Sequence, residues 1–226
     1  MNIAEVSGAV AAVEEPDLLR GLGELGMVRD VELGRRGVSV LLALPVAQWP
    51  GRAELARRVG DSLGTLAGIG DVRVEMVVMS DDERAALLEC LANPPGGEPA
   101  VLQSRPASRP EHGAPGAPPG PPHQAAGRPN RFMAPGSRTR VVGISSGKGG
   151  VGKSAVAVNL AVALAAQGHE VGLLDADVYG YSVPKMLGVD RGPTAIDDLL
   201  VPPVVHGVRC LSMGFFVPDE QPVIWR

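Results

Sequence analysis

The sequence has few cysteines, few lysines and no long hydrophobic run. These shortages exclude several kinds of protein and of metal site. Its two cysteines, Cys90 and Cys210, lie far apart, which excludes a disulfide framework and a metal site built within one local segment. The longest apolar stretch, residues 155–166, is too short to cross a membrane. The N-terminus lacks the positive charge of a secretory leader. We therefore expect a soluble cytoplasmic protein with no membrane partner.

The charged residues show no positive surplus. Lys and Arg total 21 against 25 for Asp and Glu, a formal net charge of −4 at pH 7. Nucleic-acid binders usually carry a basic excess, so we expect no nucleic-acid partner. Only three of the 21 basic residues are lysines, and two of these three stand in one short loop.

Composition divides the chain into three parts. Residues 1–92 predict a small α+β module. Residues 93–137 hold twelve of the 21 prolines, and a segment of this kind buries too little apolar surface to offset its ordering entropy, so we expect a flexible linker. Residues 138–226 return to apolar patterns and predict the first part of a parallel-sheet α/β domain.

The first module shows strand and helix patterns in turn. Alternating apolar residues predict a strand at 38–44, entered from a hairpin, and a second strand at 71–79. Leu and Val at helical spacing predict a helix over 55–66 between them. Ser80-Asp-Asp-Glu83 is a capping box that opens a further helix ending near residue 91.

The last part begins with the pattern of a β-α-β unit. A strand, a helix and a second strand are predicted at 141–144, 155–166 and 171–174. The two strands of such a unit lie parallel in one sheet with a right-handed crossover. The helix is apolar nearly all round, so we expect it to be covered on both sides. A later strand or hairpin is predicted at 204–213.

The turn between the first strand and the helix carries the chemistry. It reads Gly147-Lys148-Gly149-Gly150-Val151-Gly152-Lys153-Ser154 and fits the P-loop pattern G-x-x-x-x-G-K-[ST]. Glycines let successive N–H groups point at phosphate oxygens, and the helix dipole adds partial positive charge. In this pattern Lys153 reaches the β/γ-phosphates and the Ser154 hydroxyl ligates Mg²⁺. The loop therefore predicts a nucleotide site.

Two carboxylates, Asp175 and Asp177, follow the second strand. Alternation places both on one side, at the strand end where ligands bind in parallel sheets. Beside a P-loop, one carboxylate serves near Mg²⁺ and the other orients the attacking water. A strand-end Asp that only caps the backbone is the alternative.

These motifs together resemble the Mrp/ApbC family. Gly-Lys-Gly-Gly-Val-Gly-Lys-Ser is the deviant P-loop shared by Mrp/ApbC proteins, MinD, ParA and nitrogenase iron protein. The run Asp175-Ala-Asp-Val-Tyr-Gly-Tyr-Ser-Val-Pro184 is similar to the Mrp/ApbC segment D-A-D-[IV]-Y-G-x-S-[IV]-P, with Tyr181 where many members have Pro. Pro222-Val-Ile-Trp-Arg226 is similar to the Mrp segment that precedes a Gly-Pro.

The front module resembles the iron-sulfur-assembly-associated module often fused ahead of Mrp ATPases. The similarity rests on Glu24-Leu-Gly-Met-Val28, on the strand that ends at Ala47, and on Gly70-Asp-Val-Arg-Val74. That module usually has a cysteine before a proline after its second strand, whereas this sequence has Trp49 there.

The resemblance implies an ATP-binding and ATP-hydrolysing carrier that delivers iron-sulfur clusters to apoproteins, with ATP and Mg as cofactors. It implies that Lys148 crosses a dimer interface to the partner's nucleotide, that Asp177 handles the attacking water, and that Asp175 serves the Mg²⁺ site. A homodimer, apoprotein acceptors and iron-sulfur assembly proteins are the implied partners.

The family's D-x-P-P-G segment and its C-terminal Cys-x-x-Cys are absent from this sequence. We therefore expect an N-terminal fragment without cluster ligands, with Cys210 as a core residue and a cluster only in a full-length form. Two other functions stay open. One is a positioning ATPase of the MinD/ParA kind, and the other is an inactive adaptor fragment that does not hydrolyse ATP.

Overall fold

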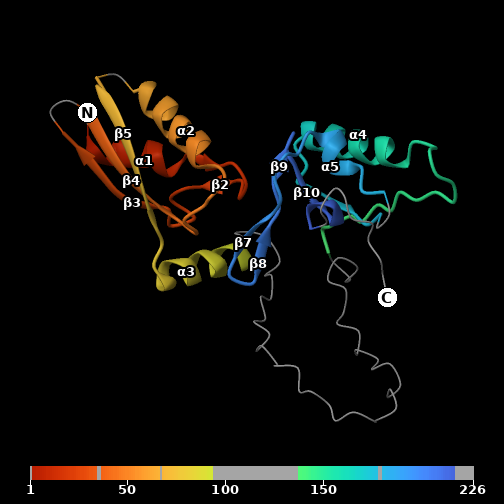
Figure 1. The fold of residues 1–226 in the computed structure, drawn as a ribbon. Helices are drawn as coiled ribbons and strands as arrows, with labels where there is room; N and C mark the ends of the chain where they lie inside the picture. The colour runs from red at the N-terminus through yellow and green to blue at the C-terminus, as the bar shows by residue number, and fades with distance from the viewer. Residues whose placement is uncertain (1, 35–36, 67, 94–136, 178–179, 217–226) are drawn as a thin grey trace, which may run out of the picture.

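The computed structural model describes residues 2–34, 37–66, 68–93, 137–177 and 180–216. They form an N-terminal unit and a C-terminal unit that lie next to each other (Figure 1). The expected linker, apart from its two end residues, and the run 222–226 lie outside the described residues. Among the helices described, none is long and apolar enough to span a membrane.

The N-terminal unit is a small sheet with helices, as the sequence predicts. Its elements are α1 (Ile3–Ala11), β1 (Glu14–Glu15), β2 (Arg20–Gly21), β3 (Val28–Leu33), β4 (Gly37–Leu44), α2 (Arg52–Gly64), β5 (Asp71–Val78) and α3 (Asp81–Ala92). The main sheet has the order β3-β4-β5, with β3 antiparallel and β5 parallel to β4. The predicted strands at 38–44 and 71–79, the hairpin and the helix between the strands are confirmed.

The core of this unit lies between the sheet and the helices α1 and α2. Alternate β4 residues, Val38, Val40 and Leu42, are buried because they face the helices. Helix α2 buries Leu55, Val59 and Leu63 at helical spacing, and α1 adds Val6 and Val10. Helix α1 and the short pair β1-β2 were not predicted, and strand β3 was implied only as the other arm of the hairpin, without bounds.

The capping box of α3 is confirmed in detail. The Ser80 Oγ accepts a hydrogen bond from the Glu83 backbone N–H (3.3 Å), and the Glu83 carboxylate accepts one from the Ser80 N–H (2.7 Å). Arg29 on β3 also pairs with Glu83. The Arg29 guanidinium and these Ser80 hydrogen bonds lower the pKa of Glu83 to about 2. The pair therefore ties the start of α3 to the sheet.

The C-terminal unit has its own small sheet. Its elements are α4 (Lys153–Ala166), β6 (Val171–Asp175), α5 (Val183–Leu187), β7 (Thr194–Ile196), β8 (Leu199–Val201), β9 (Val204–Val205), β10 (Val208–Ser212) and a 3₁₀ turn, η2 (Met213–Phe215). The sheet order is β6-β10-β9, with β6 parallel and β9 antiparallel to β10. The predicted helix, the second strand and the hairpin at 204–213 are confirmed, and Gly168 follows α4 with a φ of +86°.

Two expectations for this unit are wrong. Residues 141–144 form no strand, and Val141 and Val142 are 67% and 64% exposed. A strand needs a hydrogen-bonded neighbour, and the described residues place none there; the parallel partner of β6 is β10. Helix α4 is covered on one side only, because Val156 and Leu160 are exposed.

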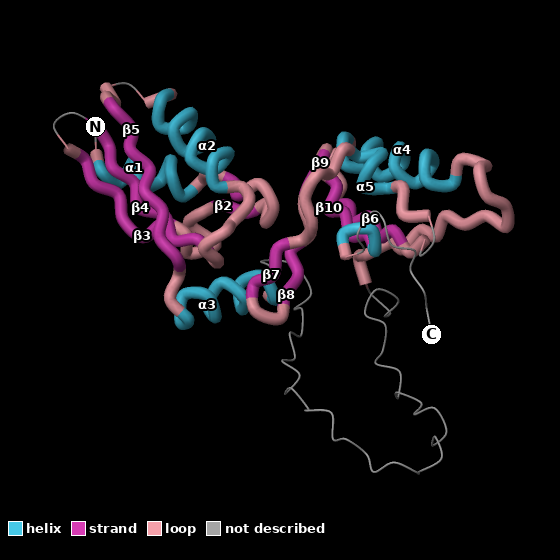
Figure 2. The backbone as a smooth tube through the Cα atoms, in the orientation of Figure 1, coloured by secondary structure: helices cyan, strands magenta, loops and turns pink. Residues whose placement is uncertain are grey.

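The hairpin β7-β8 leaves the C-terminal unit and packs against the N-terminal one. Figure 2 shows it beside α3, and Ile196 (0% exposed) and Val201 (6% exposed) belong to the same buried cluster as the N-terminal core. Arg84 on α3 pairs with Asp197 in the hairpin turn at 3.1 Å. The N-terminal core is thus completed by residues from the other unit.

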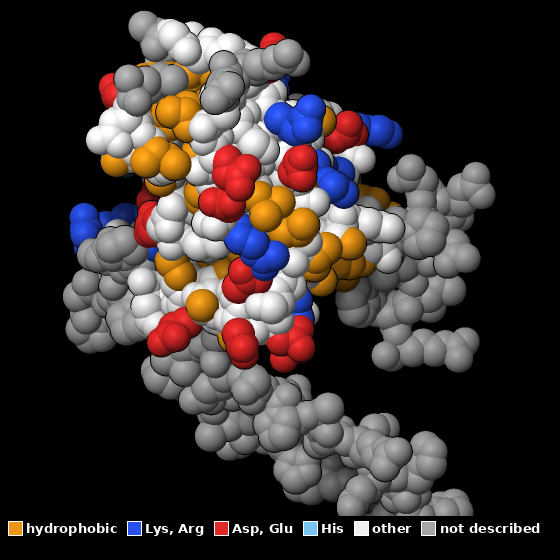
Figure 3. Space-filling view, turned by 90° about the vertical axis from the view of Figure 1, so that its left-hand side faces the viewer, with side chains coloured by type: hydrophobic (Ala, Val, Ile, Leu, Met, Phe, Trp, Pro, Cys, Tyr) orange, Lys and Arg blue, Asp and Glu red, His pale blue; other side chains and the backbone are white. Residues whose placement is uncertain are grey.

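The polar surface of the N-terminal unit carries charges of both signs. The side of the molecule in Figure 3 has acidic and basic side chains close together, with hydrophobic ones between them. On the exposed side of α2, Glu54 pairs with Arg57 and Arg58. Exposed pairs of this kind contribute little stability.

A buried carboxylate, Glu15, organises the loop after α1. Its Oε1 accepts a hydrogen bond from the Trp49 Nε1–H at 2.8 Å, and its Oε2 accepts from the backbone N–H groups of Asp17 and Leu18 at 2.8 and 2.7 Å. Burial raises the pKa of Glu15 above its ordinary value. Trp49, where the resembling module has a cysteine, is 2% exposed and serves as the side-chain donor to this acid.

We predict that Trp49→Phe lowers the free energy of unfolding by about 1–3 kcal/mol, because it leaves a buried Glu15 oxygen without its donor. Urea unfolding followed by far-UV circular dichroism measures this change. Glu15→Gln should cost a similar amount, and the double variant should cost less than the sum, since both break one contact. Arg57→Gln is the control and should leave the stability nearly unchanged, because the ion pairs of Arg57 are exposed to solvent. Additive effects of the two core changes would contradict the assigned contact.

Candidate nucleotide site

The proposed phosphate loop ends at the N-terminus of α4. Gly152 is the N-cap residue with a φ of +92°, and Gly150 has a φ of +74°. Residues other than glycine rarely adopt this left-handed backbone conformation. The shape of the turn therefore requires glycine at both positions. No side chain caps the first-turn amides of α4, and that turn holds no acidic residue. These N–H groups, with the helix dipole behind them, therefore favour an anion.

The glycines of the loop leave room beside the backbone. Within the described residues, no atom outside the local chain lies within 4 Å of where a Cβ would stand at Gly147, Gly149, Gly150 or Gly152. The loop is exposed, and the Ser146 Oγ donates a hydrogen bond to the Lys148 carbonyl at 2.9 Å. A ligand can thus approach the loop backbone closely, which phosphate binding requires.

Lys153 and Asp177 come together in the structure. The Lys153 Nζ lies 2.5 Å from the Asp177 Oδ2, and both side chains are about 30% exposed. Asp177 also accepts a hydrogen bond from the Gly180 N–H at 3.1 Å. The only lysine at the start of α4 is therefore paired with a carboxylate, at the place where the P-loop pattern predicts a phosphate.

Asp175 has a different setting from Asp177. It is the last residue of β6 and is 6% exposed. Its Oδ2 accepts hydrogen bonds from the Val183 N–H (3.3 Å) and the Ser212 Oγ (3.2 Å), and its Oδ1 accepts one from the Asp177 N–H (3.3 Å). Asp175 thus joins β6, β10 and the start of α5. Ser212 was not recognised from the sequence, because its role depends on the strand register that places it opposite Asp175.

Tyr181 packs tightly against η2. A Cβ at Gly214 would come within 2.6 Å of the Tyr181 ring, so this position requires glycine while Tyr181 stays in place. Tyr181 is the residue at which the sequence departs from the Mrp/ApbC pattern. Gly214 is therefore a second residue that only the structure links to the site.

The two cysteines have different surroundings. Cys210 is fully buried in a cluster with Val158, Val183 and Leu187, which confirms its predicted core position. Burial, with the charge of Asp175, raises the pKa of its thiol to about 11. Cys90 is half-buried, and its Sγ accepts a hydrogen bond from Arg20 at 3.3 Å. In the part of the chain that the structure describes, no three His, Cys, Asp or Glu side chains gather as a metal site would need.

A family model matches the part of the chain that contains this loop. Residues 137–226 match the family model described as the NUBPL iron-transfer P-loop NTPases of the ParA group. The match includes the loop, helix α4 and both carboxylates of the site. The resemblance stated from the sequence motifs is thereby confirmed.

Curated relatives match nearly the whole length of the chain. A protein of Mycobacterium leprae named iron-sulfur cluster carrier protein is 38% identical over 222 residues, which are 98% of this chain and 50% of the relative. A Bacillus subtilis protein of the same name is 35% identical over 224 residues, 98% of this chain and 53% of the relative. The chain spans about half the length of these curated relatives.

One solved structure also aligns with part of the chain. It is the crystal structure of a domain of unknown function, DUF59, from Bacillus anthracis. The alignment covers 38% of this chain and 90% of that chain at 20% identity, with a TM-score of 0.32.

We predict that the native chain reacts with a thiol reagent at pH 8 through Cys90 alone. Cys210 is protonated and buried at this pH, and only a thiolate reacts fast. Absorbance of a disulfide-exchange reagent should report one fast thiol in the native chain and two after unfolding in urea. In Cys90→Ser the fast phase should vanish, whereas Cys210→Ser should keep it. A fast thiol in native Cys90→Ser would show that Cys210 is accessible.

Proposed function

We propose that this chain is the nucleotide-binding part of an ATP-dependent iron-sulfur cluster carrier. The observation that carries the proposal is the uncapped N-terminus of α4, which begins at Lys153 after two left-handed glycines. The proposed cargo is inferred from the names of the relatives. The geometry of the site supports the proposal that a nucleotide binds there.

The residues present fit the triphosphate of ATP. The loop offers backbone N–H groups, free space at its glycines and the Lys153 cation, which together suit a polyanion. In the structure Lys153 is paired with Asp177. We propose that a phosphate oxygen replaces this carboxylate as the partner of Lys153 when ATP binds.

Ser154 and Asp175 are the proposed oxygen groups of the Mg²⁺ site. Ser154 follows Lys153 in the first turn of α4, and its hydroxyl has the chemistry that Mg²⁺ prefers. The Asp175 carboxylate already accepts three hydrogen bonds, out of about four positions that a carboxylate offers. One position therefore remains for the metal or a metal-bound water.

Asp177 and Lys148 are the proposed catalytic residues. Once a phosphate pairs with Lys153, the Asp177 carboxylate exchanges that one partner for a water next to the reacting group, while the Gly180 N–H still holds it. The Lys148 side chain is exposed on the loop, as a lysine that reaches the nucleotide of a partner chain must be. A homodimer of the complete protein is part of this proposal.

Iron-sulfur clusters are the proposed cargo, passed to apoprotein acceptors with the help of assembly proteins. Cluster ligands are thiolates that converge on one point. Cys210 is buried in a core and Cys90 is half-buried at the end of α3, so these two thiols do not converge on one point. We propose that the cluster is held only in a full-length form.

We predict that Lys153→Ala weakens binding of ATP with Mg²⁺ about ten- to hundredfold, because a charge-assisted hydrogen bond to phosphate is lost. Fluorescence titration with a labelled ATP analogue measures the affinity. Lys185→Ala, which removes an exposed lysine from α5, is the matched control and should bind like the unaltered chain. Unchanged affinity in Lys153→Ala would overturn the nucleotide assignment.

We predict that Asp177→Asn lowers ATP turnover of the complete protein about a hundredfold or more, since the group that orients the water is lost. Its ATP affinity should be equal or higher, because Asp177 no longer competes for Lys153. Phosphate release gives the turnover and the same titration gives the affinity. Asp190→Asn, an exposed acid after α5, is the control. Loss of affinity without loss of turnover would contradict the assigned role.

A further inference from the structure

A buried acid of the N-terminal unit, Asp17, is neutralised from the C-terminal unit. Its carboxylate is 3% exposed. The Arg191 guanidinium pairs with its Oδ1, and the Val204 backbone N–H donates to the same oxygen at 3.3 Å. Next to it, Arg209 donates to the Leu18 carbonyl at 3.3 Å. Three contacts from one unit therefore converge on two neighbouring residues of the other.

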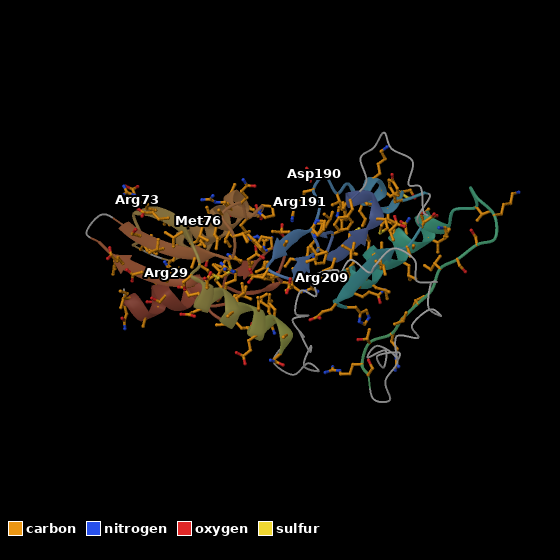
Figure 4. All side chains as sticks on the ribbon, turned by 60° about the horizontal axis from the view of Figure 1, so that its bottom comes forward. Arg29, Arg73, Met76, Asp190, Arg191 and Arg209 are labelled. Atoms are coloured by element: carbon orange, nitrogen blue, oxygen red, sulfur yellow. The ribbon has the colours of Figure 1, made fainter. Side chains whose placement is uncertain are left out.

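The position of Asp17 is set within its own unit. The Glu15 carboxylate holds the backbone N–H groups of both Asp17 and Leu18, and Trp49 holds Glu15. The acceptors that meet Arg191 and Arg209 are thus presented by a rigid turn. Figure 4 shows both arginines where the C-terminal unit faces the N-terminal one.

The same stretch of chain docks at a second point. Between Arg191 and Val204 runs the hairpin β7-β8, which buries Ile196 in the N-terminal core and pairs Asp197 with Arg84. Residues 191–209 therefore form a docking segment with polar contacts on both sides of an apolar insertion.

This docking segment is joined directly to the nucleotide site. Strand β10 carries Arg209 near one end and Ser212 at the other, and Ser212 holds Asp175. Asp175 also holds the Val183 N–H at the start of α5, and α5 ends shortly before Arg191. Both ends of the docking segment thus connect to Asp175, whose carboxylate also accepts a hydrogen bond from the Asp177 N–H.

We propose that docking of the N-terminal unit regulates the nucleotide site: the docked arrangement favours the Lys153–Asp177 pair, and nucleotide binding favours release. This inference rests on the proposed function. The Lys153 cation has two alternative partners in this proposal. It pairs with Asp177 in the docked structure, and it pairs with a phosphate when ATP is bound. A nucleotide that loosens docking must bind more tightly when docking is already weakened, because coupling between two equilibria is reciprocal.

The test uses the whole chain with Arg191→Gln, which removes the charge partner of Asp17. Arg57→Gln is the matched control, because it breaks an ion pair on α2 within the N-terminal unit. Fluorescence titration with a labelled ATP analogue and Mg²⁺ should show about fivefold or tighter binding in Arg191→Gln, and unaltered binding in the control. Arg209→Gln, which removes the contact to Leu18, should shift affinity in the same direction.

Hydrogen exchange of the Val204 amide supplies a second readout, since this amide donates to Asp17 only in the docked state. Exchange should be faster in Arg191→Gln, and faster in the unaltered chain when ATP and Mg²⁺ are added. Equal affinities in a variant whose Val204 amide exchanges faster would overturn the coupling and leave the proposed function standing. An unaltered chain that is folded but binds no ATP would instead overturn the proposed function.

Discussion

The arrangement of the C-terminal unit depends on the hydrogen bonds that one buried carboxylate, Asp175, must receive. A charge taken out of water must find hydrogen-bond donors, or its burial is too costly. Asp175 finds them in the Ser212 hydroxyl and in the N–H groups of Val183 and Asp177. These three donors fix which strand lies beside β6, where α5 begins and how the chain turns after the strand. Asp177 meets Lys153 as a consequence of that turn.

The same constraint acts in the N-terminal unit through Glu15 and Asp17. Glu15 obtains all its donors within its own unit, from Trp49 and from two backbone amides. Asp17 obtains Arg191 and the Val204 amide from the other unit. Loss of Arg191 would leave the buried Asp17 carboxylate without its charged partner, which destabilises the folded chain. The contact between the units is therefore part of what stabilises each of them.

Elements with a local signal could be predicted from the sequence, and elements defined by pairing could not. The capping box of α3, the alternation in β4 and the glycine turn before α4 each have a sequence pattern that suffices. Strand β3 has only one buried residue among six, Val31, and exists because β4 pairs with it. The apolar run 141–144 has the composition of a strand but lacks a neighbour among the described residues. Strand formation is a tertiary property in both cases.

The candidate site shows the same division. The loop residues and the two carboxylates were named from the sequence, and the structure adds that Lys153 pairs with Asp177. Alternation, however, placed Asp175 and Asp177 on one side at the end of the strand. Strand β6 ends at Asp175, so the two carboxylates diverge: one is buried among backbone donors, and the other reaches the lysine at the start of α4. This separation matters for function. A carboxylate that shapes the scaffold must keep its partners, whereas one that pairs with the phosphate-binding lysine must be able to exchange them.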